Sequence, residues 1–249
     1  MNKYNNPASR LHAFLSAAFT KKNETAMQIV WQELFSLEKN DIQKISLVQP
    51  RLIKLAFKVG EQIESIPHLQ RKDIYLKHVN KISSALFRLG HIHSVHQLKN
   101  EINQDLLDNL QICSDLLNSN SINEQSLDDD ILDKLRNEVQ SLLEQIEKLN
   151  LNDEFKKALQ SIIFELKYAI DYYIIHGVDG FKLYTERFLG HLIINKDNFD
   201  SMKGESDNKE VFSEIFRVFD QSNKLVAFAK NTTLALPYIE DFVRKLTVS

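Results

Sequence analysis

The sequence predicts an all-α protein, and its small supply of glycine and proline is the first reason. Its 249 residues include 6 Gly and 4 Pro, about 2% each where roughly 7% and 5% are usual. Sandwiches, barrels and nucleotide-binding α/β folds use these residues in turns and phosphate loops, so the composition argues against those classes. Apolar residues that recur at helical spacing along most of the chain are the second reason. We therefore expect a multi-helix bundle.

The overall composition is that of a folded globular chain. Hydrophobic residues make up 43% and charged residues 26% of the sequence, a balance typical of proteins that bury a core. The residues after Met1 lack the apolar stretch of a signal peptide, and no apolar run approaches the roughly 18 residues of a spanning helix. We therefore expect a cytoplasmic protein with no membrane span.

The single cysteine, Cys113, lies in an apolar stretch and is expected in the core as a small hydrophobe. One cysteine excludes an intrachain disulfide and a thiolate metal cluster. Phosphate loops, nucleophile elbows and the His-Glu-x-x-His zinc motif are absent from the sequence. We therefore expect no cofactor.

Capping residues mark the starts of the first helices. Asn6 and Pro7 begin the first, because Asn caps a helix and Pro is preorganised at its first position. A second helix is expected from Asn23. A third is expected from Asp41, with Pro50 as a kink.

The fourth and fifth helices lead to the clearest linker. We expect the fourth over residues 72–87, with Gly90 as its stop, and the fifth over residues 95–117, with a break near Asn103. A polar stretch rich in turn-forming residues follows. This pattern divides the chain into a basic N-terminal helical domain, a polar linker and a C-terminal domain, over residues 1–118, 119–127 and 128–249.

The strongest local pattern follows the linker. Asp128, Asp129 and Asp130 place negative charge at a helix N-terminus, where the helix dipole favours it. Two series of apolar residues at alternating spacings of three and four come next, on either side of a four-residue turn. They predict an antiparallel helical hairpin over residues 128–173. The two seams are Leu132, Leu135, Val139, Leu142, Ile146 and Leu149, and Phe155, Leu159, Ile162, Leu166, Ala169 and Tyr173.

An aromatic tail ends the chain. Asp179 is expected to cap a helix after the hairpin, and a last helix is expected from about Lys209. Apolar residues after position 211 lie on more than one face, which is more than one stripe can bury. We predict that five phenylalanines bind a partner, with the centre of the C-terminal core as the alternative role. They are Phe212, Phe216, Phe219, Phe228 and Phe242.

The net charge of −3 hides an uneven distribution. Residues 1–100 hold 15 Lys and Arg against 7 Asp and Glu, whereas residues 101–160 hold 5 against 14. The basic part either neutralises phosphates of nucleic acid, or pairs with the acidic segment of its own or a sister chain, or forms solvated faces. Nucleic-acid binders usually cluster arginines and interleave aromatics, whereas the arginines of residues 1–100 are few and widely spaced. This favours pairing with an acidic segment or ordinary solvated faces.

Three histidines form the most conspicuous cluster. His91, His93 and His96 lie within six residues, and neutral imidazole is a common zinc ligand. Residues two apart point to different sides of a helix, so His91 and His93 converge only on irregular backbone. We therefore assign no metal, and the three histidines are the alternative metal ligands.

Two arginine–histidine pairs suggest another chemistry. Arg88 and His93 are separated by four residues, and Arg71 and His78 by six. The spacing resembles that of HEPN-type ribonucleases, which are helical. That resemblance implies a histidine acting as base toward a ribose 2′-hydroxyl and an arginine stabilising the phosphate. Gly90 interrupts the helix that would hold Arg88 and His93 together, which departs from the family pattern.

A second resemblance covers about a fifth of the chain. Residues 6–11 and 166–173, followed by Gly177, Gly180 and residues 190–192, are similar to stretches of bacterial all-helical proteins of about this length. Those proteins have no established activity. The resemblance implies a bacterial, cytoplasmic protein and assigns no functional residue.

The leading hypothesis is a non-enzymatic helical protein-interaction protein, that is, a scaffold, adaptor or regulatory subunit that binds a protein partner or forms a homo-oligomer. Amphipathic helices, a helical hairpin and an aromatic tail suit helix-in-groove contacts. The alternative is a nucleic-acid-binding or HEPN-like RNA-cleaving protein that uses residues 1–100. The alternative has four candidate catalytic residues, and the leading hypothesis has none. They are Arg88, His93, Arg71 and His78.

Overall fold

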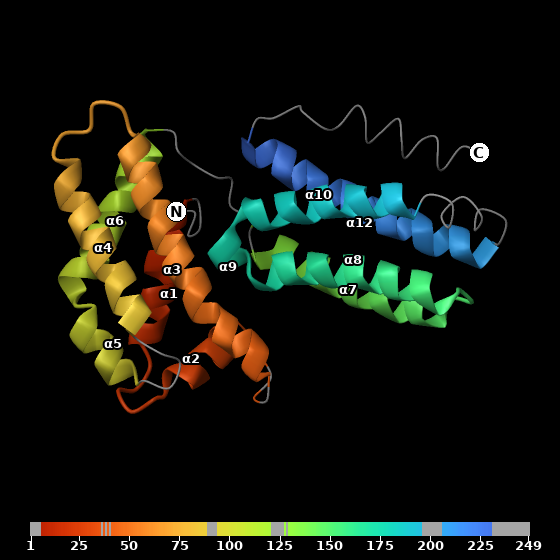
Figure 1. The fold of residues 1–249 in the computed structure, drawn as a ribbon, viewed down its shortest axis with the longest axis horizontal. Coiled ribbons are helices and arrows are strands. Elements are labelled where there is room, and N and C mark those ends of the chain that lie inside the picture. The colour runs from red at the N-terminus through yellow and green to blue at the C-terminus, as the bar shows by residue number, and fades with distance from the viewer. Residues whose placement is uncertain are drawn as a thin grey trace. The chain divides into compact units, whose positions relative to one another are not determined.

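The protein is all-α, as predicted. A computed structural model describes residues 6–35, 37, 39, 41–88, 94–120, 127, 129–195 and 206–230. Eleven helices and no strand occur in these ranges (Figure 1). None of the described helices is both long and apolar enough to cross a membrane.

The chain forms two compact units. Unit 1 consists of Met1–Ser126 together with Ile174–Gly177, and unit 2 consists of Leu127–Tyr173 together with Val178–Ser249. The sequence pattern places a linker over residues 119–127. It gives no sign that Ile174–Gly177 belongs with the N-terminal helices.

Unit 1 is built around the long helix α3. Helix α3 packs along α4, while α1 lies against both α3 and α6, and α4 also contacts α6. The apolar faces of these helices form one core, which includes Trp31 stacked on Phe14 with ring centroids 5.2 Å apart. The helices of this unit are α1 (Pro7–Phe19), α2 (Met27–Leu34), α3 (Ile42–Ser65), α4 (Lys72–Arg88), α5 (Val95–Glu101) and α6 (Gln104–Ser119).

The predicted start of the first helix is confirmed. Asn6 caps α1: its side chain accepts a hydrogen bond from Ser9 N at 2.9 Å, and the Ser9 hydroxyl accepts one from Asn6 N at 3.1 Å. The same side chain donates to Ser114 O at 3.2 Å and to Asn118 Oδ1 at 2.8 Å. Asn6 is fully buried, so one residue both starts α1 and ties it to the end of α6.

Helix α2 begins at Met27, four residues after the predicted start. The backbone before Met27 makes hydrogen bonds to the start of α5 instead of helical ones. Asn23 O accepts from His96 N, and Thr25 O accepts from Val95 N, each at 2.9 Å. A residue whose carbonyl pairs with another segment does not close a helical turn. The first turn of α5 therefore delays the start of α2.

The predicted break near Asn103 is confirmed. Helix α5 ends at Glu101, Ile102 is extended and fully buried, and Asn103 caps α6. The Asn103 side chain accepts from Leu106 N at 3.1 Å. This break sets the short helix α5 and the long helix α6 at the edge of unit 1, beside α4.

Unit 2 contains an antiparallel four-helix bundle. Contacts run from α7 to α8, from α8 to α10, from α10 to α12, and from α12 back to α7, which closes the ring of a bundle. Figure 1 shows these long helices side by side. They are α7 (Asp129–Lys148), α8 (Asp153–Asp171), α10 (Val178–Ile194) and α12 (Ser206–Lys230).

The predicted hairpin is confirmed as α7 and α8 of this bundle. All twelve residues of the two seams are buried, and none is more than 7% exposed. The turn between the helices ends at Asn152, whose side chain caps α8 by accepting from Phe155 N at 2.8 Å. The alternating spacing therefore identified the inward face of both helices.

A four-residue helix, α9 (Tyr173–His176), separates α8 from α10. Gly177 follows it with φ 57°, a left-handed conformation that glycine adopts without steric cost. The predicted cap at Asp179 is wrong: α10 already begins at Val178, so Asp179 lies in its first turn. A carboxylate there is still favoured by the helix dipole.

Candidate functional site

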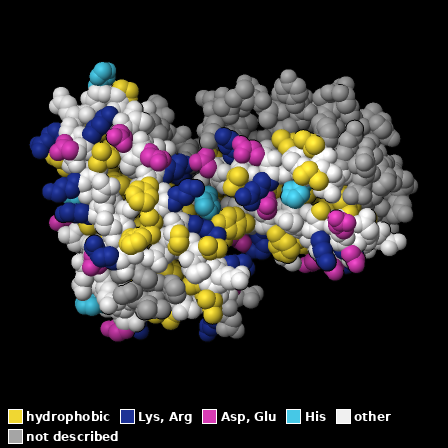
Figure 2. All heavy atoms as spheres, in the orientation of Figure 1, with side chains coloured by type: hydrophobic (Ala, Val, Ile, Leu, Met, Phe, Trp, Pro, Cys, Tyr) yellow, Lys and Arg dark blue, Asp and Glu magenta, His cyan; other side chains and the backbone are white. Residues whose placement is uncertain are grey.

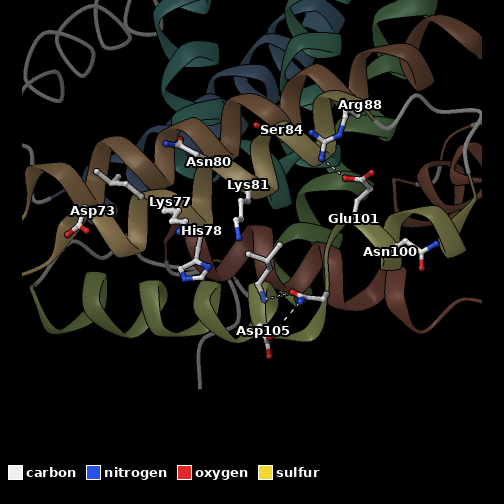
Figure 3. A pocket seen from close by; sticks show the side chains of 13 residues that line it. Asp73, Lys77, His78, Asn80, Lys81, Ser84, Arg88, Asn100, Glu101 and Asp105 are labelled. Atoms are coloured by element: carbon white, nitrogen blue, oxygen red, sulfur yellow. Dashed lines mark hydrogen bonds and ion pairs between the residues drawn. The ribbon is translucent and has the colours of Figure 1, made fainter.

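Unit 1 carries an open polar groove between α4 on one side and α5 and α6 on the other. Its volume is about 860 Å³. Figure 3 shows Asp73 at one end of the groove and the pair of Arg88 and Glu101 at the other. The lining residues are Asp73, Leu76, Lys77, His78, Asn80, Lys81, Ser84, Arg88, Asn100, Glu101, Asn103, Asp105 and Leu106.

One face of α4 forms the first wall. Lys77, Lys81, Ser84 and Arg88 follow one another at spacings of four, three and four residues, so they share one face of the helix over about 16 Å. All four are exposed. The other face holds this wall in place by packing into the core, through Val79, Ile82, Ser83, Ala85 and Leu86.

The junction of α5 and α6 forms the opposite wall. Glu101 is the last residue of α5, and Asn103 caps α6. Asp105 lies in the first turn of α6, with its Oδ2 3.5 Å from Asn103 Nδ2. Lys81 extends from α4 toward the start of α6 (Figure 3). Most of the basic side chains therefore lie on the α4 wall, which also carries Asp73 at its start, and the opposite wall carries carboxylates with amides.

An ion pair joins the two walls. Arg88 donates to Glu101 across the groove, and the two side chains are 59% and 38% exposed. Exposed ion pairs contribute little to stability, because water solvates both charges well. The pair therefore closes one end of the groove without locking it.

Among the described residues, His78 is the only histidine that lines the groove. The residue is half-buried, and its Nδ1 is buried and has no hydrogen-bond partner among the described residues. Nε2 is therefore the ring atom available to a ligand. Carried as Nε2–H, the ring presents a hydrogen-bond donor to the groove.

Three of the four candidate catalytic residues lie within the described part of the chain. Arg71 precedes α4 with φ 55° and does not line the groove, whereas His78 does. Arg88 also lines the groove, but it lies ten positions after His78 on the same helix, a rise of about 15 Å. His93 lies outside the described residues.

Of the three histidines considered as metal ligands, His91 and His93 lie outside the described residues. His96 is exposed, and its Nε2 lies 3.2 Å from Asn100 Nδ2. The parts of the chain that the structure describes contain no group of three His, Cys, Asp or Glu side chains placed to hold a metal ion.

The five phenylalanines predicted to bind a partner differ in how deeply they are buried. Phe219 is fully buried and stacks on Phe188 with ring centroids 4.0 Å apart, and Phe216 packs edge-on against Phe188 at 6.0 Å. These two rings belong to the core of unit 2, because each helix of the bundle buries its apolar face against the others. Phe212 is half-buried, 6.4 Å from Phe155. The side chain of Phe228 and all of Phe242 lie outside the described residues.

Cys113 is in the core of unit 1, as expected. The side chain is 1% exposed. Burial raises the pKa of its thiol to about 12, because an apolar environment disfavours the thiolate. Cys113 therefore behaves as a small hydrophobe.

Sequence reasoning missed Lys77 and Lys81 as candidate binding residues. Their spacing with Ser84 and Arg88 is a polar stripe that could have been found on the predicted fourth helix. The opposite wall has no such signal, because it depends on how the junction of α5 and α6 packs beside α4.

The chain matches no protein-family model, no curated protein and no solved structure. A fold alone does not define an activity. The function is therefore argued from the chemistry of the groove. Figure 2 shows basic side chains beside acidic ones along the α4 side of unit 1.

Proposed function

We propose that the chain is a cytoplasmic helical protein-interaction protein, and that the α4 groove of unit 1 binds a polypeptide segment of another protein. The observation that carries this proposal is the mixed chemistry of the groove. Lys77, Lys81 and Arg88 face Glu101 and Asp105, with amides and a hydroxyl among them. A polypeptide presents donors, acceptors and both signs of charge along one segment.

The dimensions of the groove support the same occupant. The α4 wall, from Lys77 to Arg88, extends over about 16 Å, which matches about five residues of an extended chain or about eleven of a helix. The groove is open along its length, so a segment can enter from the side.

Nucleic acid is the competing occupant of the basic N-terminal half. Asp73, Glu101 and Asp105 line the groove together with the basic residues, so a nucleic acid, which carries a phosphate at every nucleotide, meets like charge along the groove, whereas a polypeptide can place its acidic side chains opposite the basic residues alone. Nucleic acid would therefore have to bind at another surface of unit 1. Steep loss of RNA or DNA affinity with salt at tens of nanomolar protein would support that alternative.

A steric block of the groove tests the proposal. Ser84 is exposed and lies in the middle of the α4 wall, so Ser84→Trp fills the groove without disturbing the core. Ser46→Trp is the matched control, because Ser46 is an exposed serine on α3 that does not line the groove.

Each variant is used as bait in cells of the source organism, and the captured proteins are identified by mass spectrometry. The proposal predicts that Ser84→Trp loses a defined protein that both the wild-type chain and Ser46→Trp retain. Identical captures by all three chains would contradict it. Circular dichroism verifies that both variants are folded.

A further inference from the structure

We infer that the groove recognises acidic side chains of its polypeptide partner through Lys77, Lys81 and Arg88, and that Glu101 occupies Arg88 until a partner carboxylate replaces it. This inference rests on the proposed function and adds the chemistry of the bound segment. Three relationships among the lining residues carry it.

The carboxylates of the groove are already compensated inside the protein. Asp73 lies in the first turn of α4 and Asp105 in the first turn of α6, where the helix dipole and unpaired backbone N–H groups favour negative charge. Glu101 is paired with Arg88. Three acidic and three basic side chains line the groove. The negative charge of each acidic side chain is already stabilised, either by the N-terminus of its helix or by Arg88.

The two lysines differ from these carboxylates. Lys77 and Lys81 lie in the middle of α4, where neither end of the helix dipole acts on them. Neither lysine makes an ion pair with a described residue, and both are exposed one helical turn apart. Their positive charge is therefore the part of the groove that a ligand can neutralise.

Arg88 offers a third cationic position through exchange. Its pair with Glu101 is exposed on both sides, so the cost of separating the two charges is small. A partner carboxylate can bind the same guanidinium with two parallel hydrogen bonds. Glu101 then acts as an internal competitor that holds Arg88 in position and gives way to the partner.

The spacing of these three cations defines the segment. Lys77 and Lys81 are about 6 Å apart along the helix axis, and Lys81 and Arg88 about 10 Å. A helix with acidic residues at i, i+4 and i+11 matches these intervals, because its rise per residue is the same. An extended segment of the same reach would carry the third acidic residue at about i+5, on the face opposite i and i+2, so the helical segment is the better match.

The test uses a fluorescein-labelled, alanine-based 15-residue peptide with Glu at positions 2, 6 and 13, and the same peptide with Gln there. Binding to the full chain is followed by fluorescence anisotropy at low salt. We expect the Glu peptide to bind at least tenfold more tightly than the Gln peptide, with an advantage that shrinks as salt rises. Equal binding of the two peptides would overturn the inference and leave the proposed function standing.

Variants assign the effect to the named residues. Lys81→Gln should weaken binding of the Glu peptide about fivefold or more, with recovery in Lys81→Arg, while Glu101→Gln should tighten it severalfold. Glu61→Gln is the matched control, because Glu61 is an exposed glutamate on α3 outside the groove, and it should leave binding unchanged. Tightening by Glu61→Gln as strong as that by Glu101→Gln would show general electrostatics and overturn the assignment.

Two further outcomes distinguish a failure of this inference from a failure of the proposed function. Failure of the Glu peptide to bind overturns the inference, and the Ser84→Trp capture experiment then decides whether the groove binds another kind of segment. Displacement of the Glu peptide by a uridine 12-mer at far lower concentration than by unlabelled peptide would also overturn it, in favour of nucleic acid.

Discussion

Arg88, the last residue of α4, pairs with Glu101, the last residue of α5, and so connects the C-terminal ends of these two helices. The pair lies at the end of the groove opposite Asp73 (Figure 3). Because both partners are exposed, the contact can exchange with water or with a ligand. Its value is in positioning the Arg88 guanidinium over the groove rather than in stabilising the fold.

We predict that Leu142→Ala destabilises the protein by about 2–5 kcal/mol, because Leu142 is fully buried in the seam between α7 and α8. Leu143→Ala is the control, because Leu143 is the next residue on α7 and is only half-buried. This substitution should cost about 1 kcal/mol or less. Urea titration of both variants gives the comparison. Equal costs would mean that the seam is not the interior of the bundle.

Asn6→Ala should cost more than the loss of a helix cap alone. The substitution removes the cap of α1 together with the hydrogen bonds to Ser114 and Asn118, for a total of about 2–4 kcal/mol. Asn152→Ala removes only the cap of α8 and should cost about 1 kcal/mol. Thermal unfolding of the two variants, measured in parallel, checks the order. A smaller loss of stability for Asn6→Ala than for Asn152→Ala would contradict the role given to the buried hydrogen bonds of Asn6.

Stability should fall with pH between about 6.5 and 4, in part because of His176. Burial, followed by the positive charges of Arg51, Lys54, Arg10 and Lys58, lowers the pKa of His176 from its usual 6.5 to about 4. The unfolded chain binds a proton on this ring below pH 6.5, whereas the folded chain does not until about pH 4. The free energy of unfolding therefore decreases over that interval, by on the order of 2–3 kcal/mol from this group.

His176→Gln isolates that contribution, because glutamine does not titrate. Urea titrations at pH 7 and pH 4.5 should show a smaller difference for the variant than for the wild-type chain. The same pH dependence in both proteins would mean that His176 is not held neutral in unit 1.

Phe219→Ala should destabilise unit 2 by about 3–5 kcal/mol, since the ring is fully buried against Phe188 and Tyr184. Light scattering should give the same mass for the wild-type chain and for the folded variant, because this ring is a core residue. A change in oligomeric mass without a loss of stability would restore the interface assignment for Phe219.

The sequence predicted best those features that depend on local patterns. The seams of Leu142 and Leu166 were visible because a heptad-like spacing persists over two long helices, and the break at Asn103 because a capping residue interrupts an apolar series. The late start of α2 at Met27 was not visible, since it arises from hydrogen bonds to α5, a segment about 70 residues away.

The candidate site was predicted only in part, for the same physical reason. His78 and Arg88 attracted attention through their residue types, yet the groove depends on α4 lying beside the junction of α5 and α6. Tertiary contacts of this kind are not encoded in the spacing of one helix. In the C-terminal segment, the number of phenylalanines suggested an interface from residue type alone. The rings of Phe216 and Phe219 are instead buried among the helices of unit 2.

The most direct test of the central claim is photo-crosslinking from inside the groove. A photoreactive phenylalanine analogue replaces Ser84 in one chain and Ser46 in another, each is irradiated in cells, and the adducts are identified by mass spectrometry. The account predicts a protein adduct from position 84 that is absent from position 46 and lost when Lys77 and Lys81 are both changed to Glu. An RNA adduct at position 84, or the same protein adducts from both positions, would contradict it.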